Sequence, residues 1–160
     1  MILSSFIVPC FNSQNTVKIC INSILHQNNI NENVEIIIID DGSTDNSIKI
    51  IKSYSDQRIL ILRHDSNKGI AKALNFGLEY ARCRFIARMD ANDIAYPSRF
   101  AEQYNFFSNH PKAVAVFCPV EKINKDVRYK FGNKNNFYKK INELNQETET
   151  LIDEIEKWQT

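Results

Sequence analysis

The chain has 160 residues, 43% of them hydrophobic, which suffices for one ordinary domain with a core and excludes a disordered chain. With 20 basic and 19 acidic residues its formal net charge is +1, so no global charge directs it to nucleic acid. The four cysteines lie far apart without a CxxC pair, which argues against zinc and predicts reduced, mostly buried thiols in a cytoplasmic protein. No run approaches the ~18 apolar residues of a membrane span, so we expect a soluble or peripheral protein.

Strands and helices are expected to alternate along the first 120 residues. The expected strands are 2–9, 34–39, 59–62, 85–89 and 113–120, and the expected helices begin near residues 16, 46, 70 and 97. The apolar run from Val34 to Ile39 is almost continuous, as is typical of a strand covered on both faces in a parallel sheet. The alternation predicts a layered α/β fold with a mostly parallel sheet and right-handed crossovers.

Two of the expected strands end in acidic loops, Asp40–Gly42 and Asp90–Asp93. Parallel strands present their carboxyl ends on one edge of a sheet, so we expect the two loops to lie near each other. Such loops could hold a divalent cation and a nucleotide diphosphate, because Mg²⁺ and Mn²⁺ prefer oxygen ligands. The alternative is that Asp and Asn only form turns and helix caps.

Four ordered motifs resemble the family 2 glycosyltransferases over roughly residues 2–120. They are IVPCFN (7–12), VEIIIIDDGSTDNS (34–47), NKGIAKALNFGLEYA (67–81) and FIARMDANDIAYPSRF (85–100). The resemblance implies the glycosyltransferase A fold, a Rossmann-like three-layer α/β/α arrangement. It also implies transfer of a sugar, with inversion, from a nucleotide-diphosphate donor, expected to be a UDP-sugar. The implied acceptor is a glycan or a lipid-linked molecule, as in cell-surface polysaccharide synthesis.

The resemblance assigns the nucleotide base to the first two motifs. Residues 9–12 match the family's P-x-[YF]-N turn, which begins at Pro9. Phe11 would then stack on the base, unless it is an ordinary core residue near a strand end, and Asn12 would shape the turn. Asp41 would accept a hydrogen bond from the base.

The third motif and the rest of the acidic turn have less specific roles. Ser43 and Asp45 are expected to shape the turn and cap the following helix. Asn67, Lys68 and Gly69 match the family's N-x-G loop, where Lys68 either neutralises phosphate or is solvated. Gly69 would let the backbone come close to a ligand.

The fourth motif departs from the family at the metal position. Asp90 and Asn92 occupy the two ends of the family's D-x-D, so the resemblance places Asp90 by the ribose and a Mn²⁺ or Mg²⁺ ion at Asn92. An amide oxygen brings no negative charge and is expected to bind the ion more weakly than a carboxylate. Asp93 either compensates for the missing charge or caps the next helix.

No catalytic residue is identified in this chain. Inverting members of the family use an Asp or Glu as general base beyond the D-x-D, but Asp126, Asp153 and Glu154 stand in no recognisable motif. The base would come from a partner chain or from an unrecognised residue. The alternative hypothesis is a truncated, inactive nucleotide-binding module that assembles through its C-terminal helix.

Two segments are expected after the domain of residues 1–120. Residues 121–136 are rich in Lys, Arg and Asn and predict a basic linker or irregular ribbon, solvated or in contact with the inner face of a membrane. Residues 137–160 predict a C-terminal heptad helix that either drives homo-oligomerisation as a coiled coil or packs on the domain. Its seam comprises Phe137, Ile141, Leu144, Thr148, Leu151, Ile155 and Trp158.

Overall fold

The computed structural model describes residues 4–28, 34–118, 120, 122–123 and 128–129. The chain divides into two compact units, Met1–Ala101 and Glu102–Thr160, and the cleft described below lies wholly in the first. Within the described residues no helix has the length and apolar character needed to cross a membrane.

The first unit is built on a four-stranded parallel sheet. Its strands are β1 (Ser4–Cys10), β2 (Val34–Asp40), β3 (Ile59–Arg63) and β4 (Phe85–Arg88). They stand in the order β3-β2-β1-β4, and β1 and β2 are in register from Ser4 opposite Val34 to Cys10 opposite Asp40. The predicted parallel α/β fold is therefore confirmed, and all four strands point their carboxyl ends toward one edge.

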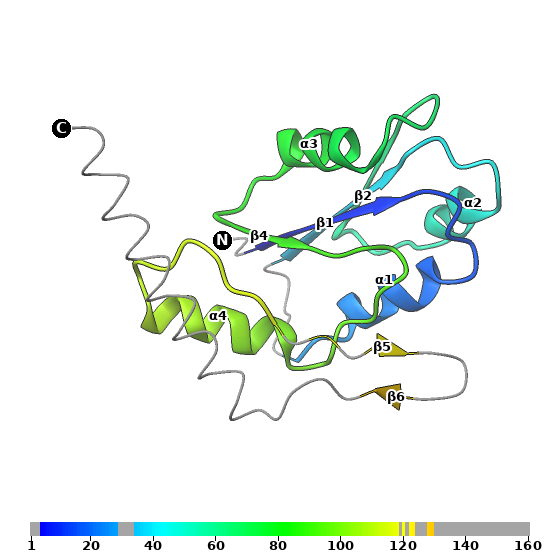
Figure 1. The fold of residues 1–160 in the computed structure, drawn as a ribbon. Helices are drawn as coiled ribbons and strands as arrows, with labels where there is room; N and C mark the ends of the chain where they lie inside the picture. The colour runs from blue at the N-terminus through cyan, green and yellow to red at the C-terminus, as the bar shows by residue number, and fades with distance from the viewer. Residues whose placement is uncertain (1–3, 29–33, 119, 121, 124–127, 130–160) are drawn as a thin grey trace. The chain divides into compact units, whose positions relative to one another are not determined.

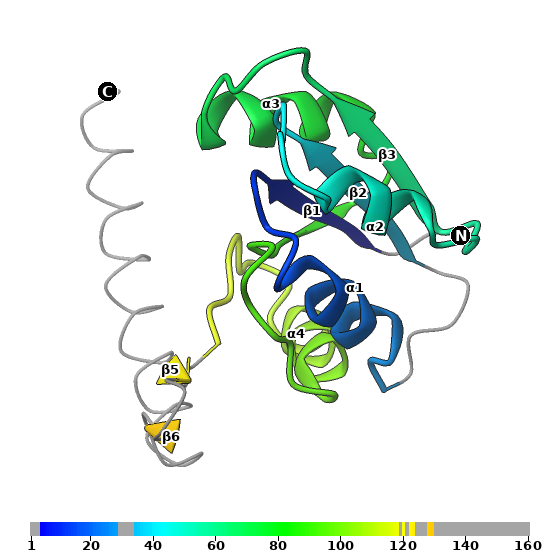
Figure 2. The same cartoon turned by 90° about the vertical axis from the view of Figure 1, so that its right-hand side faces the viewer.

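Helices cover both faces of this sheet. The helices between the strands are α1 (Val17–Leu25), α2 (Ser47–Lys52) and α3 (Ile70–Tyr80), and α4 (Arg99–Asn109) follows β4 in the chain. Figures 1 and 2 show α1 and α2 on one face of the sheet and α3 on the other. This is the three-layer arrangement expected from the sequence, because each strand-to-strand crossover carries a helix.

The nearly continuous apolar run of β2 is explained by two cores. Ile36 and Ile38 face α1 and α2, whereas Ile37 and Ile39 face α3, and all four are fully buried. Burying each of them contributes about 2 kcal/mol. On the α3 side a Cβ added to Gly77 would lie 2.7 Å from Cδ1 of Ile39, so the glycine lets the helix approach the sheet closely.

All four cysteines are free in the structure. Cys10 and Cys20 are buried, and burial raises the pKa of Cys10 to about 11 and that of Cys20 to about 12. Cys83 and Cys118 are half-buried. The two buried thiols are therefore neutral core side chains at ordinary pH.

The second unit departs from the sequence prediction. The expected fifth strand at 113–120 is wrong for the residues described there, which form no strand. Val114 is 78% exposed and Phe117 72%, so this apolar run has no neighbour to pair with among the described residues. A strand forms only when its backbone groups find a hydrogen-bonded partner, whatever its β propensity.

The segment predicted as a linker or irregular ribbon contains a short antiparallel pair. Strand β5 (Lys122–Ile123) pairs with β6 (Arg128–Tyr129). The predicted heptad helix at 137–160 lies outside the described residues.

Candidate functional site

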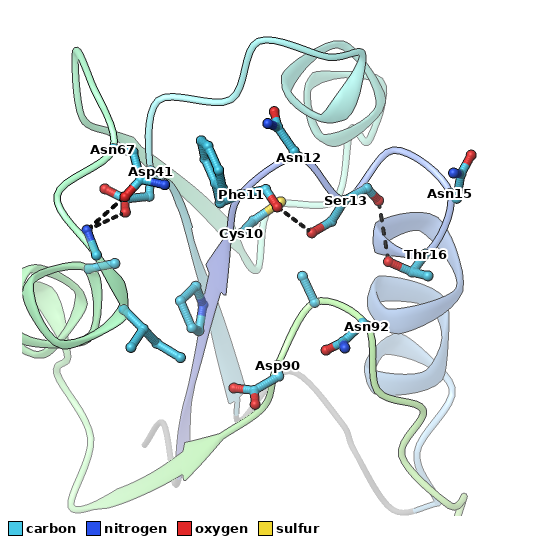
Figure 3. A pocket seen from close by; sticks show the side chains of 15 residues that line it. Cys10, Phe11, Asn12, Ser13, Asn15, Thr16, Asp41, Asn67, Asp90 and Asn92 are labelled. Atoms are coloured by element: carbon cyan, nitrogen blue, oxygen red, sulfur yellow. Dashed lines mark hydrogen bonds between the residues drawn. The ribbon is translucent and has the colours of Figure 1, made fainter. Parts of the chain in front are cut away.

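A cleft of about 570 Å³ opens at the carboxyl edge of the sheet, where ligands bind in open α/β sheets. Its walls come from the loops after β1, β2 and β4 and from the start of α3, as Figure 3 shows. The residues lining it are Pro9, Cys10, Phe11, Asn12, Ser13, Asn15, Thr16, Asp41, Asn67, Gly69, Ile70, Ala73, Asp90, Ala91 and Asn92. The two acidic loops thus share one cleft, as their strand ends predicted.

Hydrogen bonds tie the loop after β1 to the loop after β2. The backbone N–H of Asn12 donates to Oγ of Ser43 at 3.0 Å, and the Asn12 side chain accepts from the Thr44 N–H at 2.9 Å. Asn12 has a φ of 47°, a left-handed conformation that Asn tolerates better than most residues. Asn12 therefore shapes the turn through both its backbone and its side chain.

The same two loops are joined again one residue further along. The N–H of Ser13 donates to Oγ of Ser47 at 2.7 Å, and the N–H of Gln14 donates to Oδ2 of Asp45 at 3.0 Å. Oδ1 of Asp45 accepts the Ser47 N–H at 2.9 Å at the start of α2. Ser43 and Asp45 thus stabilise loops and a helix start.

Gly42 allows a third loop, residues 64–69, to lie against this pair. Its φ is +73°, and an added Cβ would stand 2.5 Å from the backbone carbon of Ser66 and 2.7 Å from N of Asn67. No side chain fits there without moving backbone. The glycine thereby brings the N–H groups of Lys68 and Gly69 to Asp41.

Asp41 is a buried carboxylate surrounded by donors. Its side chain accepts from the Lys68 N–H at 3.0 and 3.1 Å through both oxygens, and from the Gly69 N–H at 2.8 Å. Nδ1 of His64 lies 2.6 Å from Oδ1. Only 3% of Asp41 is exposed, yet it lines the cleft. Figure 3 shows Asp41 and Phe11 among the side chains around the cleft.

These donors keep Asp41 ionised. Burial alone would raise the pKa of Asp41, but the hydrogen bonds from His64, Lys68 and Gly69 outweigh it and lower the pKa below the usual value. Because an ionised carboxylate can only accept, Nδ1 of His64 must carry the hydrogen and donate it. Asp41 therefore presents a fixed acceptor to the cleft.

Phe11 stands in the cleft with 44% of its surface exposed. An exposed aromatic ring beside a buried acceptor offers a flat surface on which a nucleobase can stack. The position rules out the alternative of an ordinary core phenylalanine. Pro9 lines the cleft floor at the end of β1.

The N-x-G loop contributes through its backbone. Lys68 is exposed and is not among the residues that line the cleft, and its N–H donates to Asp41. Gly69 lines the cleft with a φ of +88° and nothing within 4 Å of an added Cβ, so the space beside it is open.

The loop after β4 brings Asp90 and Asn92 to the opposite side of the cleft (Figure 3). Nη2 of Arg99 donates to the carbonyl of Arg88 at 2.9 Å, and Sγ of Cys20 donates to the carbonyl of Asp90 at 3.4 Å. Nη2 of Arg88 contacts both oxygens of the Asp90 carboxylate, at 3.0 and 3.1 Å.

Asp93 is placed differently from its two partners in the motif. It does not line the cleft, and its N–H closes a turn by donating to the Asp90 carbonyl at 3.0 Å. Partial burial, together with the nearby Asp90 carboxylate, raises the pKa of Asp93. Of the three predicted metal ligands, Asp90 and Asn92 are the ones that the cleft brings together.

The oxygen ligands of this loop suit a hard divalent cation such as Mg²⁺. Substrate and water supply most of the ligands of such an ion. One carboxylate and one amide oxygen face the cleft, and no cluster of three or more His, Cys, Asp or Glu exists within the described residues. Mg²⁺ sites in nucleotide enzymes commonly use one or two carboxylates plus phosphate oxygens. Arg88 would compete with such a cation for the Asp90 carboxylate.

His64 is the site residue that the sequence did not reveal. It is 8% exposed and stacks on Phe76 of α3 with 4.8 Å between ring centroids. In the sequence it belongs to a polar loop, and a single histidine there carries no pattern. Only the fold of this loop over Gly42 brings its ring to Asp41.

The parallel α/β sheet thus carries a buried acceptor, an exposed aromatic ring and a second acidic loop at its carboxyl edge, where open α/β sheets bind their ligands. The family model for glycosyl transferase family 2 matches residues 5–157, so this chain belongs to that family. The resemblance of the four motifs is confirmed.

Two curated relatives show the extent of the similarity. An uncharacterized glycosyltransferase of Haemophilus influenzae is 42% identical over 123 residues, 76% of this chain and 38% of that protein. The Escherichia coli UDP-Glc:alpha-D-GlcNAc-diphosphoundecaprenol beta-1,3-glucosyltransferase WfgD is 40% identical over 92 residues, 58% of this chain and 36% of that protein. The chain spans between 28% and 50% of the length of its leading curated relatives.

Solved structures agree on the fold. Crystal structures of S. aureus TarS 1-349, one with UDP and one with UDP-GlcNAc, align with TM-scores of 0.64 and 0.65 and 25% identity, over 68% of this chain and about a third of theirs. The mannosyltransferase PcManGT from Pyrobaculum calidifontis, solved with GDP-Man and Mn²⁺, aligns with a TM-score of 0.61 and 20% identity over 66% of this chain. These neighbours confirm the glycosyltransferase A type of fold.

Proposed function

We propose that the cleft binds a uridine diphosphate sugar and that the chain is the donor-binding part of an inverting glycosyltransferase. The acceptor would be a glycan or a lipid-linked sugar used in cell-surface polysaccharide synthesis. WfgD takes UDP-Glc and a diphosphoundecaprenol-linked acceptor, and TarS was crystallised with UDP-GlcNAc, which supports this donor and acceptor class.

The geometry of Asp41 is the observation that carries the proposal. The Lys68 N–H is shared between both oxygens of the buried Asp41 carboxylate, so a carboxylate that lines the cleft and has three donors can still accept one more hydrogen bond, from a ligand. Uracil offers its ring N–H for this bond while its face stacks on Phe11. A nucleobase needs both contacts at once, and both residues line one cleft.

The diphosphate would lie between the start of α3 and the loop after β4. Gly69, Ile70 and Ala73 line the cleft, so the positive end of the α3 dipole faces the bound anion. Asp90 and Asn92 would hold a Mn²⁺ or Mg²⁺ ion opposite. The ion's chemistry is to neutralise the negative charge that develops on the leaving diphosphate.

Inversion needs a general base that takes the proton of the acceptor hydroxyl as it attacks the sugar. Within the described residues the cleft offers Asp41 and Asp90 as its carboxylates, and both are assigned to the donor. The base would then come from outside the described part of this chain, or from a partner.

Calorimetry with uridine diphosphate, with and without Mn²⁺, tests the donor site. We expect binding that weakens about a hundredfold in Asp41→Ala, since a hydrogen bond to a charged group contributes roughly 1.5–3 kcal/mol. Lys52→Ala, which removes an exposed charge at the end of α2, is the control and should bind normally. Absence of UDP binding by the wild-type chain would overturn the proposal.

The second candidate is a nucleotide-binding module without transfer activity of its own. Asn92 in place of a carboxylate favours it, because the amide weakens the metal site. A donor-hydrolysis assay with UDP-glucose and UDP-N-acetylglucosamine distinguishes the two. Release of sugar that depends on Asp90 and Mn²⁺ supports the enzyme, and UDP binding without sugar release supports the module.

The proposed acceptors place the protein in the cytoplasm at the inner face of a membrane, with residues 121–136 as a basic contact. Co-sedimentation with anionic vesicles at low and high salt tests this.

The heptad pattern at 137–160 would assemble copies of the chain. Light scattering with and without these residues tests that, and equal monomer masses would contradict self-association.

A further inference from the structure

His64 and Asp41 form a buried pair behind the cleft. Nδ1 and Oδ1 are 2.6 Å apart, and the two side chains are 8% and 4% exposed. The imidazole is fixed from its other side by the ring of Phe76, which is tilted by 24° from it. A ring stacked in this way has little freedom to turn away from the carboxylate.

Among the described residues His64 is the only side chain that donates to Asp41, and the other donors are backbone N–H groups. The adjacent carboxylate of Asp40 is neutralised separately by Nε of Arg63 at 3.1 Å. Other charged groups nearby are exposed: Asp65 and Lys68 on the same loop, and Lys72 and Glu79 on α3. Asp90 lies across the cleft. The charge state of Asp41 therefore depends most directly on His64.

The charge state of Asp41 decides which pyrimidine it can bind. Uracil presents a ring N–H, which requires an acceptor, whereas cytosine presents a bare ring nitrogen at the same position, which requires a donor. An ionised carboxylate has no hydrogen to donate, so it attracts the first and repels the lone pair of the second. A protonated carboxyl group would accommodate cytosine.

We propose that His64 is a positioning residue that keeps Asp41 a pure hydrogen-bond acceptor, and that this pair makes the cleft select uracil over cytosine. The proposal rests on the proposed uridine nucleotide site and adds the residue that sets its base selectivity. The two bases have the same size and stacking surface, so shape alone cannot separate them. A buried polar group that faces a base without a matching hydrogen-bonding group strongly disfavours the binding of that base.

The test compares Kd values of UDP and CDP by calorimetry between about pH 5 and pH 8, the range in which a poorly stabilised buried carboxyl group titrates. The variants are His64→Leu, which removes the donor, and His64→Asn, whose amide nitrogen takes the place of Nδ1. Wild type and His64→Asn should prefer UDP by about a hundredfold around neutral pH, the size expected from one hydrogen bond to a charged group, and should keep most of this preference near pH 5, where the ring nitrogen of cytosine begins to take up a proton.

In His64→Leu the preference should shrink about tenfold or more near pH 5 and recover toward pH 8, because only the deprotonated carboxylate rejects cytosine. A merely structural role of His64 would weaken both nucleotides alike. Should the leucine variant fail to fold by circular dichroism, His64→Gln, which moves the donor away from Oδ1, replaces it.

A ¹³C titration of the Asp41 carboxyl group gives a reading without nucleotide, and its pKa should rise in His64→Leu but not in His64→Asn. An unchanged UDP-to-CDP ratio in His64→Leu overturns the role of His64 and leaves the donor site intact. If the wild-type chain binds neither nucleotide, the proposed function fails instead.

Discussion

The two sides of the cleft are built differently. The proposed base side, residues 9–14, 41–47 and 64–69, consists of loops joined to one another by hydrogen bonds, and the donors of residues 64–69 meet on the 3%-exposed Asp41. The phosphate side, residues 90–93, carries Asp90 with a 37%-exposed carboxylate and the exposed Asn92. One side is preorganised, and on the other Arg88 competes with a cation for the Asp90 carboxylate.

Because of this difference, we expect one side of the cleft to recognise the ligand and the other side to neutralise its charge. Preorganised donors and acceptors cost little reorganisation when a ligand arrives, so the base side can set affinity and selectivity. An exposed ion pair contributes between about 0 and 1 kcal/mol, so the phosphate side can open at small cost. Mutations on the base side should therefore change both folding and binding, and those on the phosphate side mainly metal affinity.

The largest effect is expected from Gly42→Ala. The new Cβ would collide with backbone of Ser66 and Asn67 at a residue whose φ is +73°. We expect the free energy of unfolding to fall by about 3 kcal/mol from strain and overpacking together. Urea unfolding measures this loss, and calorimetry should show that UDP binding falls with it.

Gly69→Ala is the matched control for this variant. Its φ of +88° and ψ of 158° also strain any residue other than glycine, but an added Cβ has nothing within 4 Å. The loss should be about 2 kcal/mol, from strain alone. Equal losses at the two glycines would show that the contact with residues 66 and 67 does not matter.

Asp41→Asn should remove a pH-dependent part of the stability. The pKa of Asp41 is lowered in the folded state, so its stabilisation is complete above the unfolded pKa of about 3.9 and is lost as pH falls through the folded pKa. We expect Asp41→Asn to be less stable by about 2 kcal/mol at neutral pH, with the difference closing toward pH 2.

Unfolding midpoints between about pH 2 and pH 7 test this sign. Asp65→Asn, which makes the same change at an exposed position on the next loop, is the control and should follow the wild type. A constant difference between Asp41→Asn and wild type across this range would contradict the role of the ionised form.

The sequence predicted the sheet, its helices and the shared edge, because those follow from local periodicity and from apolar runs such as Val34 to Ile39. It also predicted Phe11 and Asp41 in one cleft. It missed His64, whose place depends on how residues 64–69 cross Gly42. It also predicted a strand at 113–120 from β propensity, which says nothing about whether a pairing partner is present.

Asn92→Asp should strengthen the phosphate side. A second carboxylate in the cleft adds charge for a hard cation, and we expect Mn²⁺ affinity to rise about tenfold, or 1.4 kcal/mol. Electron paramagnetic resonance of free Mn²⁺ during titration measures it without substrate. Asn109→Asp, at the exposed end of α4 and outside the residues lining the cleft, adds the same charge and should leave the affinity unchanged.

Arg88→Gln should give the smallest gain, about twofold to threefold in Mn²⁺ affinity. The guanidinium contacts both oxygens of Asp90 but is 57% exposed, and such exposed pairs contribute less than about 1 kcal/mol. Removing it frees the carboxylate and also removes a positive charge that opposes the ion. Lys49→Gln on α2 makes the same change in net charge at a distance from Asp90. An equal gain in Mn²⁺ affinity in that variant would show that the effect of Arg88→Gln is a general electrostatic one. If Arg88→Gln instead lowers UDP affinity while it raises Mn²⁺ affinity, the Arg88 guanidinium contacts the diphosphate after leaving Asp90. The phosphate side then binds anions by exchanging the Asp90 carboxylate for the diphosphate as the partner of Arg88.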